Sequence, residues 1–229
     1  MTETVVLCGS LGSTSAIWDV QGPALGGRRV VCVEHPGHDG APATDLQTVA
    51  DLARRVLARV DDPRFSFVGL SLGGAVGMQL ALSSPRRLDR LVLACTSARF
   101  GEPEDWEARA ALVRLQGLEA IVDAVLGRWF TPAFGRSGEF REMFLSTDRE
   151  SYARCCEVIS RWDARTELAG IEAPTLVVSG EEDPSTPPEH GELIARLIPD
   201  ARFEPISRAA HLANVERPDE FNRLLEEFL

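Results

Sequence analysis

The sequence has no apolar run long enough to cross a membrane. No stretch of about 18 consecutive apolar residues, the length that a transmembrane helix needs, occurs in its 229 residues. The first ten residues, MTETVVLCGS, lack the basic and long apolar regions of a secretory signal. We therefore expect a soluble, unprocessed protein with no membrane partner.

The chain also lacks an excess of positive charge. The formal net charge is -11 at pH 7, which disfavours binding to nucleic acid and to anionic membranes, because both require a local excess of basic side chains. An anionic small molecule stays allowed as a substrate, provided that an arginine close to the site overrides the general repulsion.

No cysteine pair has the C-x-x-C spacing, and a single domain of this length needs no disulfide or metal to be stable. Three of the five cysteines lie in apolar runs, where cysteine commonly acts as a small hydrophobic residue. We expect free thiols in a reducing cytoplasm. The five are Cys8, Cys32, Cys95, Cys155 and Cys156.

Short apolar runs alternate with helical patterns along the chain. Continuous apolar runs indicate strands that are buried on both faces, and their alternation with helices predicts an α/β fold with a doubly wound parallel sheet. The clearest helical patterns run from Leu46 to Val60 and from Pro218 to the C-terminus. The predicted strands are Thr4–Cys8, Arg29–Val33, Phe65–Gly69, Leu88–Ala94, Pro174–Ser179 and Arg202–Ile206.

The rhythm changes between Arg99 and Ala169, where helical segments holding Trp106, Trp129 and Trp162 replace the strands. Ligands bind at the carboxyl ends of the strands in open α/β sheets, and an insertion at this point would emerge there. We expect residues 1–98 and 170–229 to form the core and 99–169 to form a helical cap. A few extra packing helices are the simpler alternative.

The stretch Gly69-Leu-Ser-Leu-Gly73 places Ser71 between two glycines, after a predicted strand and before a predicted helix. Such a sharp turn from strand to helix needs small residues on both sides of the serine, which then points outward as a nucleophile. Glycine and serine are also common in turns that have no catalytic role. The assignment of Ser71 as a nucleophile therefore depends on finding a base and an acid elsewhere in the sequence.

A serine nucleophile needs a base, and the base needs an orienting acid. His211 follows the last predicted strand, and Asp183 follows the strand before it, so all three side chains leave carboxyl ends of parallel strands. We predict a triad of Ser71, His211 and Asp183. Glu181 and Glu182 are near rivals for the acid, Asp163 is a distant one, and His190 is expected to be solvated.

Glu34, His35 and His38 lie in the stretch VEHPGHDG. This Pro/Gly turn does not match the helical H-E-x-x-H geometry of a zinc site. We therefore predict no metal site.

Two backbone N–H groups should stabilise the oxyanion. The N–H of Leu72 follows the nucleophile, and we assign the second donor to Leu11 in the loop after the first strand. Gly9 and Gly12 would allow that loop to approach closely. The loop lacks the G-x-G-x-x-G and G-K-[ST] patterns of nucleotide sites.

With these residues placed, the sequence resembles the α/β-hydrolase superfamily and, within it, the 3-oxoadipate enol-lactone hydrolases of aromatic catabolism (the beta-ketoadipate pathway). The resemblance covers nearly the whole chain. It rests on SLGSTSAIWDVQGPAL, VGLSLGGAVGMQLAL, RRLDRLVLACTSARFG, GRWFTPAF, APTLVVSGEEDPSTPPEHG and AAHLANVERPDEFN.

The resemblance implies an α/β-hydrolase fold and hydrolysis of a small anionic lactone, with no cofactor. Ser71 would attack the lactone carbonyl, and water would then release the acyl group. An arginine suits the substrate's carboxylate arm better than a lysine. Arg128 is the first candidate to bind it, and Arg109 is the second. The neighbouring Trp129 is a candidate for the wall of the substrate pocket, with a place in the core as the alternative.

The sequence departs from this family in two places. The family has an additional β-hairpin before the strand that corresponds to Thr4–Cys8, so we expect six strands, all parallel, with an exposed edge at Arg29–Val33 that a second subunit of a homo-oligomer could cover. Glu34 and Asp39 replace the usual Asp and Gly of the second turn, and Gly9-Ser10 replaces His-Gly.

Two other functions fit parts of the sequence. A carboxylesterase or another lactonase would use the same triad, because the cap sets the specificity. A noncatalytic small-molecule binding module would have a broken triad, and no member is missing here. A haloalkane dehalogenase would need Asp in place of Ser71.

Overall fold

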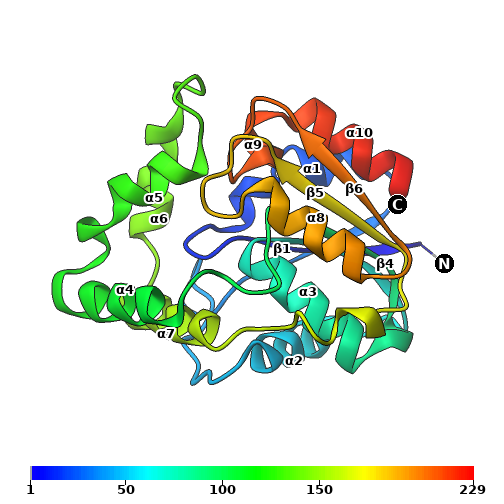
Figure 1. Ribbon diagram of the computed structural model, residues 1–229, viewed down its shortest axis with the longest axis horizontal. Coiled ribbons are helices and arrows are strands. Elements are labelled where there is room, and N and C mark those ends of the chain that lie inside the picture. Colours follow the sequence, from blue (N-terminus) through cyan, green and yellow to red (C-terminus); the bar gives the residue numbers. More distant parts are fainter. Residues whose placement is uncertain (1) are drawn as a thin grey trace.

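The computed structural model describes residues 2–229 and contains one six-stranded, fully parallel sheet (Figure 1). The strand order is β2-β1-β3-β4-β5-β6. This confirms the predicted parallel α/β sheet. The strands are β1 (Thr4–Cys8), β2 (Arg29–Val33), β3 (Phe65–Leu70), β4 (Leu88–Ala94), β5 (Thr175–Gly180) and β6 (Ala201–Ile206).

Burial explains the continuous apolar runs. Every residue of β1, β3 and β5 is buried, because helices cover both faces of the sheet. β2 is an edge strand, as predicted: Arg29 is exposed, the next three residues are half-buried and Val33 is buried. Coverage of this edge by a second subunit stays a prediction.

The core helices lie on both faces of the sheet (Figure 1). Right-handed crossovers place α1 and α10 on one face and α2, α3 and α8 on the other. Because the strand order reverses at β1, a crevice is expected at the carboxyl ends of β1 and β3. The core helices are α1 (Gln21–Ala24), α2 (Val49–Arg59), α3 (Leu72–Ser83), α8 (Pro188–Leu197), α9 (Ala213–Glu216) and α10 (Pro218–Phe228).

α2 begins three residues later than the apolar pattern begins. The Asp51 carboxylate accepts from the Thr48 N–H, and the Thr48 side chain bonds back to the first turn, so the two form a capping box that fixes the helix start. Leu46 is buried although it precedes the helix. Five 3₁₀ turns complete the regular structure of residues 2–229: η1 (Ser15–Trp18), η2 (Pro85–Arg87), η3 (Leu118–Ala120), η4 (Ser137–Phe140) and η5 (Leu168–Gly170).

Residues 99–169, the cap segment, contain helices and no strand. Its four α-helices lie together beyond one end of the sheet, opposite the two chain termini (Figure 1). The division of the chain into core and cap domains stays a prediction. The helices are α4 (Pro103–Gln116), α5 (Val122–Trp129), α6 (Arg141–Leu145) and α7 (Arg149–Ser160). No helix within residues 2–229 is long and apolar enough to span a bilayer.

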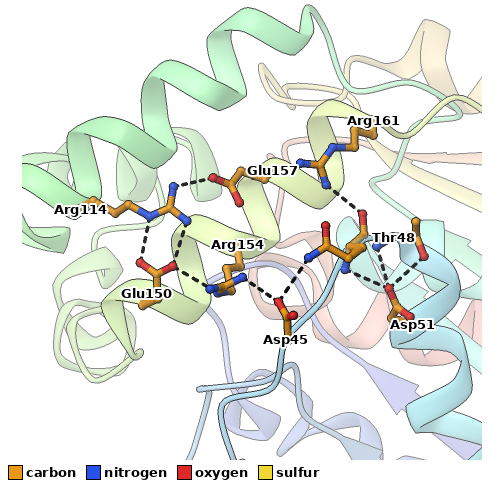
Figure 2. Close-up of polar contacts among 9 residues, drawn as sticks. Asp45, Thr48, Asp51, Arg114, Glu150, Arg154, Glu157 and Arg161 are labelled. Carbon is orange, nitrogen blue, oxygen red and sulfur yellow. Dashed lines mark hydrogen bonds and ion pairs between the residues drawn. The ribbon is translucent and has the colours of Figure 1, made fainter.

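A polar network joins the cap segment to the loop before α2 (Figure 2). Arg114 of α4 binds Glu150 and Glu157 of α7. Arg154 of α7 continues the network to Glu150 and to Asp45 of the core, with N–O distances of 3.2 and 2.7 Å. These side chains are partly exposed, so each pair stabilises the fold only modestly. Together they connect α7 to α4 and to the core.

Candidate active site

Ser71 lies at a strained corner between β3 and α3. Its backbone angles are φ 59° and ψ -115°, a conformation that L-residues rarely adopt and that costs about 1–3 kcal/mol. The Ser71 N–H donates to Ala94 O at 2.9 Å, and the Thr96 hydroxyl donates to Ser71 O at 2.7 Å. Hydrogen bonds on both sides of the residue therefore hold the strained turn in place.

The flanking glycines are required by close backbone contacts. A Cβ atom on Gly69 would lie 2.2 Å from Gly73 O, and one on Gly73 would lie 2.1 Å from Cys8 O. Both distances are far below van der Waals contact. The G-x-S-x-G spacing thus reflects a turn in which β3, α3 and the end of β1 meet with no room for side chains.

His211 and Asp183 form a buried pair at the carboxyl ends of β6 and β5. His211 Nδ1 lies 2.8 Å from Asp183 Oδ2, and the two residues are 4% and 3% exposed. This contact leaves the Nε2 atom of His211 as its free ring nitrogen. The two rivals Glu181 and Glu182 are exposed, and Asp163 pairs with Arg165 at the surface.

Asp183 accepts further hydrogen bonds from the loop that follows it. The N–H groups of Ser185 and Thr186 donate to Oδ1 at 2.7 and 3.1 Å, and the Thr186 hydroxyl donates to Oδ2 at 2.7 Å. Burial acts to raise the pKa of Asp183, but nearby His211 and these hydrogen bonds outweigh burial and lower the pKa below its ordinary value. The carboxylate is therefore ionised at neutral pH.

Leu11 and Leu72, the predicted oxyanion donors, come from the loop after β1 and from the start of α3. Leu72 is the first residue of α3, where N–H groups have no acceptor within the helix. Leu11 lines the same cavity as Ser71 and is 6% exposed. Gly12 has φ +83°, and its Cα lies so close to Phe144 of α6 that a Cβ atom would be 2.5 Å from the ring. The cap segment thus packs directly on this loop.

Two buried histidines in the turn after β2 form hydrogen bonds with the loop that contains Leu11. His35 Nε2 lies 2.9 Å from Gly9 O, and the Gly12 N–H donates to His38 Nε2 at 2.9 Å. His38 Nδ1 lies 2.9 Å from Pro36 O, so His38 is neutral with its proton on Nδ1. Burial lowers the pKa of His35 to about 4 and, together with nearby His35, that of His38 to about 3. This H-x-x-H stretch is a structural support, and residues 2–229 contain no cluster of three or more metal-ligating side chains.

Ser71 and His211 open into one cavity of about 510 Å³ between the sheet and the cap segment. Its lining includes the predicted residues Leu11, Arg128 and Trp129, together with Arg109. Trp129 is 3% exposed and packs edge-on against Phe144, so it belongs to the core and to the cavity wall at once. The other lining residues are Ser10, Phe100, Gly101, Asp105, Trp106, Val125, Tyr152, Ile159, Pro184, Ser185 and Thr186.

The two cavity arginines differ in their surroundings. Arg128 is exposed, whereas Arg109 is half-buried, with its guanidinium carbon 4.7 Å from the centre of the Trp106 ring. Burial raises the pKa of the Tyr152 hydroxyl, and nearby Arg109 offsets part of this rise. Neither arginine takes part in the ion pairs found within residues 2–229. Both are therefore available to an anionic ligand.

Comparison with known proteins identifies the family of this site. The model of the Alpha/beta hydrolase family matches residues 5–224. The chain belongs to the alpha/beta hydrolase family. Among its relatives is 3-oxoadipate enol-lactonase 2 of Acinetobacter baylyi. The two sequences are 35% identical over 97% of this chain and 86% of the relative's length.

Other hydrolases are similar over most of their length. The crystal structure of the enol-lactonase from Burkholderia xenovorans LB400 has a TM-score of 0.96 and 36% identity, covering 100% of this chain and 91% of that one. RutD of Variovorax paradoxus is 31% identical over 99% of this chain and 91% of its own length. The similarity thus establishes a hydrolase, while relatives with different names share its fold.

Several residues at this site were not predicted from the sequence. Thr186 and Thr96 each donate a side-chain hydrogen bond to a loop of the predicted triad, and the Glu216 carboxylate accepts from the Ala210 N–H beside His211. None of these contacts leaves a motif in the sequence. The sequence raised His35 and His38 only as metal ligands, a role that the Pro/Gly turn disfavours, and indicated no other role for them. The structure shows that the turn after β2 packs against Gly9 and Gly12, where the two histidines support the loop that contains Leu11.

Proposed function

We propose that this alpha/beta hydrolase opens 3-oxoadipate enol-lactone to 3-oxoadipate through a Ser71–His211–Asp183 triad and an acyl-enzyme. The observation that carries the proposal is the convergence of Ser71 and His211, with Asp183 bound to His211, on a cavity that also holds two arginines without acidic partners. The similarity to enol-lactonases supports the choice of substrate.

The mechanism follows from the atoms that face the cavity. Nε2 of His211 takes the Ser71 proton as Oγ attacks the lactone carbonyl, and Asp183 holds Nδ1 so that the free nitrogen is the basic one. The N–H groups of Leu72 and Leu11 stabilise the oxyanion, each donor contributing about 3 kcal/mol to lowering the barrier. The C–O bond of the ring breaks, and the leaving enolate takes up a proton and becomes a ketone.

Water completes the reaction. Activated by His211, it attacks the acyl group on Ser71 and releases the second carboxylate of the product. The steps balance with water as the only co-reactant, so no cofactor enters the proposal. The five free thiols fit the reducing cytoplasm in which we expect the enzyme to work.

The substrate's carboxylate requires a cation, and this chain offers only arginine. All 24 of its Lys and Arg residues are arginines. We propose that Arg128 and Arg109 bind the carboxymethyl arm and that Trp129 forms the wall beside it.

The experiment that tests the substrate is a comparison of kcat/KM across a panel. The panel contains 3-oxoadipate enol-lactone, its neutral methyl ester, simple carboxylic esters and a carbamate. We expect kcat/KM of about 10⁴ M⁻¹s⁻¹ or more for the anionic lactone and values at least about a hundred-fold lower for neutral compounds, since each charge-assisted contact contributes about 1.5–3 kcal/mol. Preference for a simple ester would establish the alternative, a carboxylesterase of the same fold.

A further inference from the structure

Glu216 at the end of α9 is a buried carboxylate that the proposed mechanism does not use. It is 9% exposed and lies between the loop that contains His211 and the cap segment. Oε1 accepts from the Thr131 N–H at 3.0 Å and from the Thr131 hydroxyl at 2.8 Å, and Oε2 accepts from the Ala210 N–H at 2.6 Å. One side chain thus connects the residue that precedes His211 with the end of α5.

A second contact connects the other side of His211 to the same segment. The Leu212 N–H donates to Trp129 O at 2.9 Å. Both chain neighbours of His211 are therefore bonded, directly or through Glu216, to residues 129–131. His211 and Trp129 both line the cavity, so these contacts determine how the base lies relative to the cavity wall.

The charge of Glu216 has no basic partner. None of the ion pairs within residues 2–229 includes it, so three donors alone offset the cost of its burial. Breaking such a set exposes the full desolvation cost of each group left unpaired. The arrangement therefore favours one geometry of the two segments over all others.

We propose that Glu216 is a positioning residue that fixes the His211 loop and the Trp129 wall of the cavity in a single arrangement. It acts through Ala210 on the base and through Thr131 on the wall. The inference rests on the proposed role of Ser71 and His211. It adds a residue, and a pair of segments that it joins, to that mechanism.

Glu216→Gln tests the proposal with the least change in shape. An amide has one oxygen, so its NH₂ group must face either the Ala210 N–H or the Thr131 N–H, and that N–H loses its acceptor. Because displacements near 1 Å can reduce rates about a hundred-fold, we expect kcat per active site on the enol-lactone to fall about 10- to 100-fold, with a rise in KM. Active sites are counted by mass spectrometry after complete labelling of Ser71 with a sulfonyl fluoride.

Counting sites separates positioning from a loss of folded protein. A purely structural role would lower the number of labelled sites and leave kcat per site at the wild-type value. Positioning predicts full labelling, at a slower rate, with a reduced kcat per site. The proton between His211 Nδ1 and Asp183 gives a reading without substrate: its low-field NMR signal, assigned by its loss in His211→Gln, should shift in Glu216→Gln.

Thr131 offers a matched pair of variants. Thr131→Val keeps the peptide N–H and the branched shape but removes the hydroxyl donor, whereas Thr131→Ser keeps the hydroxyl. We expect a several-fold loss of kcat per site in the valine variant and recovery in the serine variant. If Glu216→Gln does not fold, equal kcat values in this pair overturn the proposal.

Ser71→Ala separates the failure of this inference from failure of the proposed function. If Ser71→Ala is inactive and Glu216→Gln has wild-type kcat per site and an unshifted proton signal, the positioning role is wrong and the triad stands. If Ser71→Ala retains activity on the lactone, the triad is wrong, and the role of Glu216 falls with it.

Discussion

The peptide N–H of Gly73, in the first turn of α3, donates a hydrogen bond to the carbonyl oxygen of Gly9, 3.1 Å away. The same oxygen lies 2.9 Å from His35 Nε2. Gly9 thereby joins the loop of one proposed oxyanion donor to the helix whose first residue supplies the other. The spacing between the two donors depends on this contact.

Gly73→Ala should disrupt the spacing. Its Cβ atom would lie 2.1 Å from Cys8 O, so β1 and α3 must move apart. We expect a loss of activity of about 10²-fold or more, the size seen when one oxyanion donor is removed, and a lower Tm. Gly22→Ala, whose Cβ meets nothing within 4 Å, is the control and should keep both values. Wild-type kcat/KM in Gly73→Ala would refute this description of the loop.

Stability should fall as the pH drops below about 6.5. The unfolded chain takes up a proton at each histidine near that pH, whereas burial keeps His35 neutral to about pH 4 and His38 to about pH 3. Between these values the unfolded state binds more protons, so the free energy of unfolding decreases on acidification, by up to about 1.4 kcal/mol per pH unit for each histidine. Urea unfolding from pH 7.5 to 4.5 measures the slope.

Variants that cannot titrate assign this slope to the two histidines. His35→Gln and His38→Asn should each reduce the slope of the unfolding free energy with pH by the contribution of about one proton, even if they lower stability at pH 7.5. An unchanged slope in both variants would mean that other groups cause the acid sensitivity.

Asp183→Asn should leave the fold intact and abolish most of the activity. The amide would hold His211 in the wrong tautomer, with the proton on Nε2, and in a triad this change costs about 10⁴-fold in kcat. Asp163→Asn, which removes an exposed acid paired with Arg165, is the matched control and should remain active. Comparable activity in the two variants would assign the acid elsewhere.

Substitution of the cavity arginines should affect the anionic substrate selectively. Arg109→Gln and Arg128→Gln should each raise KM for the enol-lactone about ten-fold or more, since a charge-assisted hydrogen bond contributes about 1.5–3 kcal/mol. KM for the neutral methyl ester should change little. Arg136→Gln, which removes an exposed partner of Glu139, serves as the surface control. Equal effects on both substrates would remove that arginine from substrate recognition.

Patterns local in the sequence predicted most of the fold. The strand from Phe65 and the helix ending at Phe228 follow from apolar runs and periodicity, because burial between two layers of helices leaves a direct mark on composition. Ser71, Asp183 and His211 could be proposed as a triad because each follows its own strand. Parallel strands place such residues at the same edge of the sheet.

The supporting contacts could not be predicted in the same way. Glu216 forms a hydrogen bond with Thr131, 85 residues away in the sequence, and Gly12 forms one with His38, 26 residues away. A carboxylate or an imidazole in a loop has many available partners, and only the packing of the cap segment on the core selects one. The roles of Glu216 and His38 therefore follow from their contacts in the structure and not from residue type alone.

Hydrolysis of 3-oxoadipate enol-lactone by the wild-type protein and by Ser71→Ala tests the central claim most directly. The loss of lactone absorbance should proceed at an ordinary enzymatic rate with the wild type and fall to the background rate with the variant, whose circular dichroism should match the wild type. Undiminished hydrolysis by Ser71→Ala would contradict the serine mechanism. No wild-type turnover of the lactone, with esters still cleaved through Ser71, would contradict the proposed substrate.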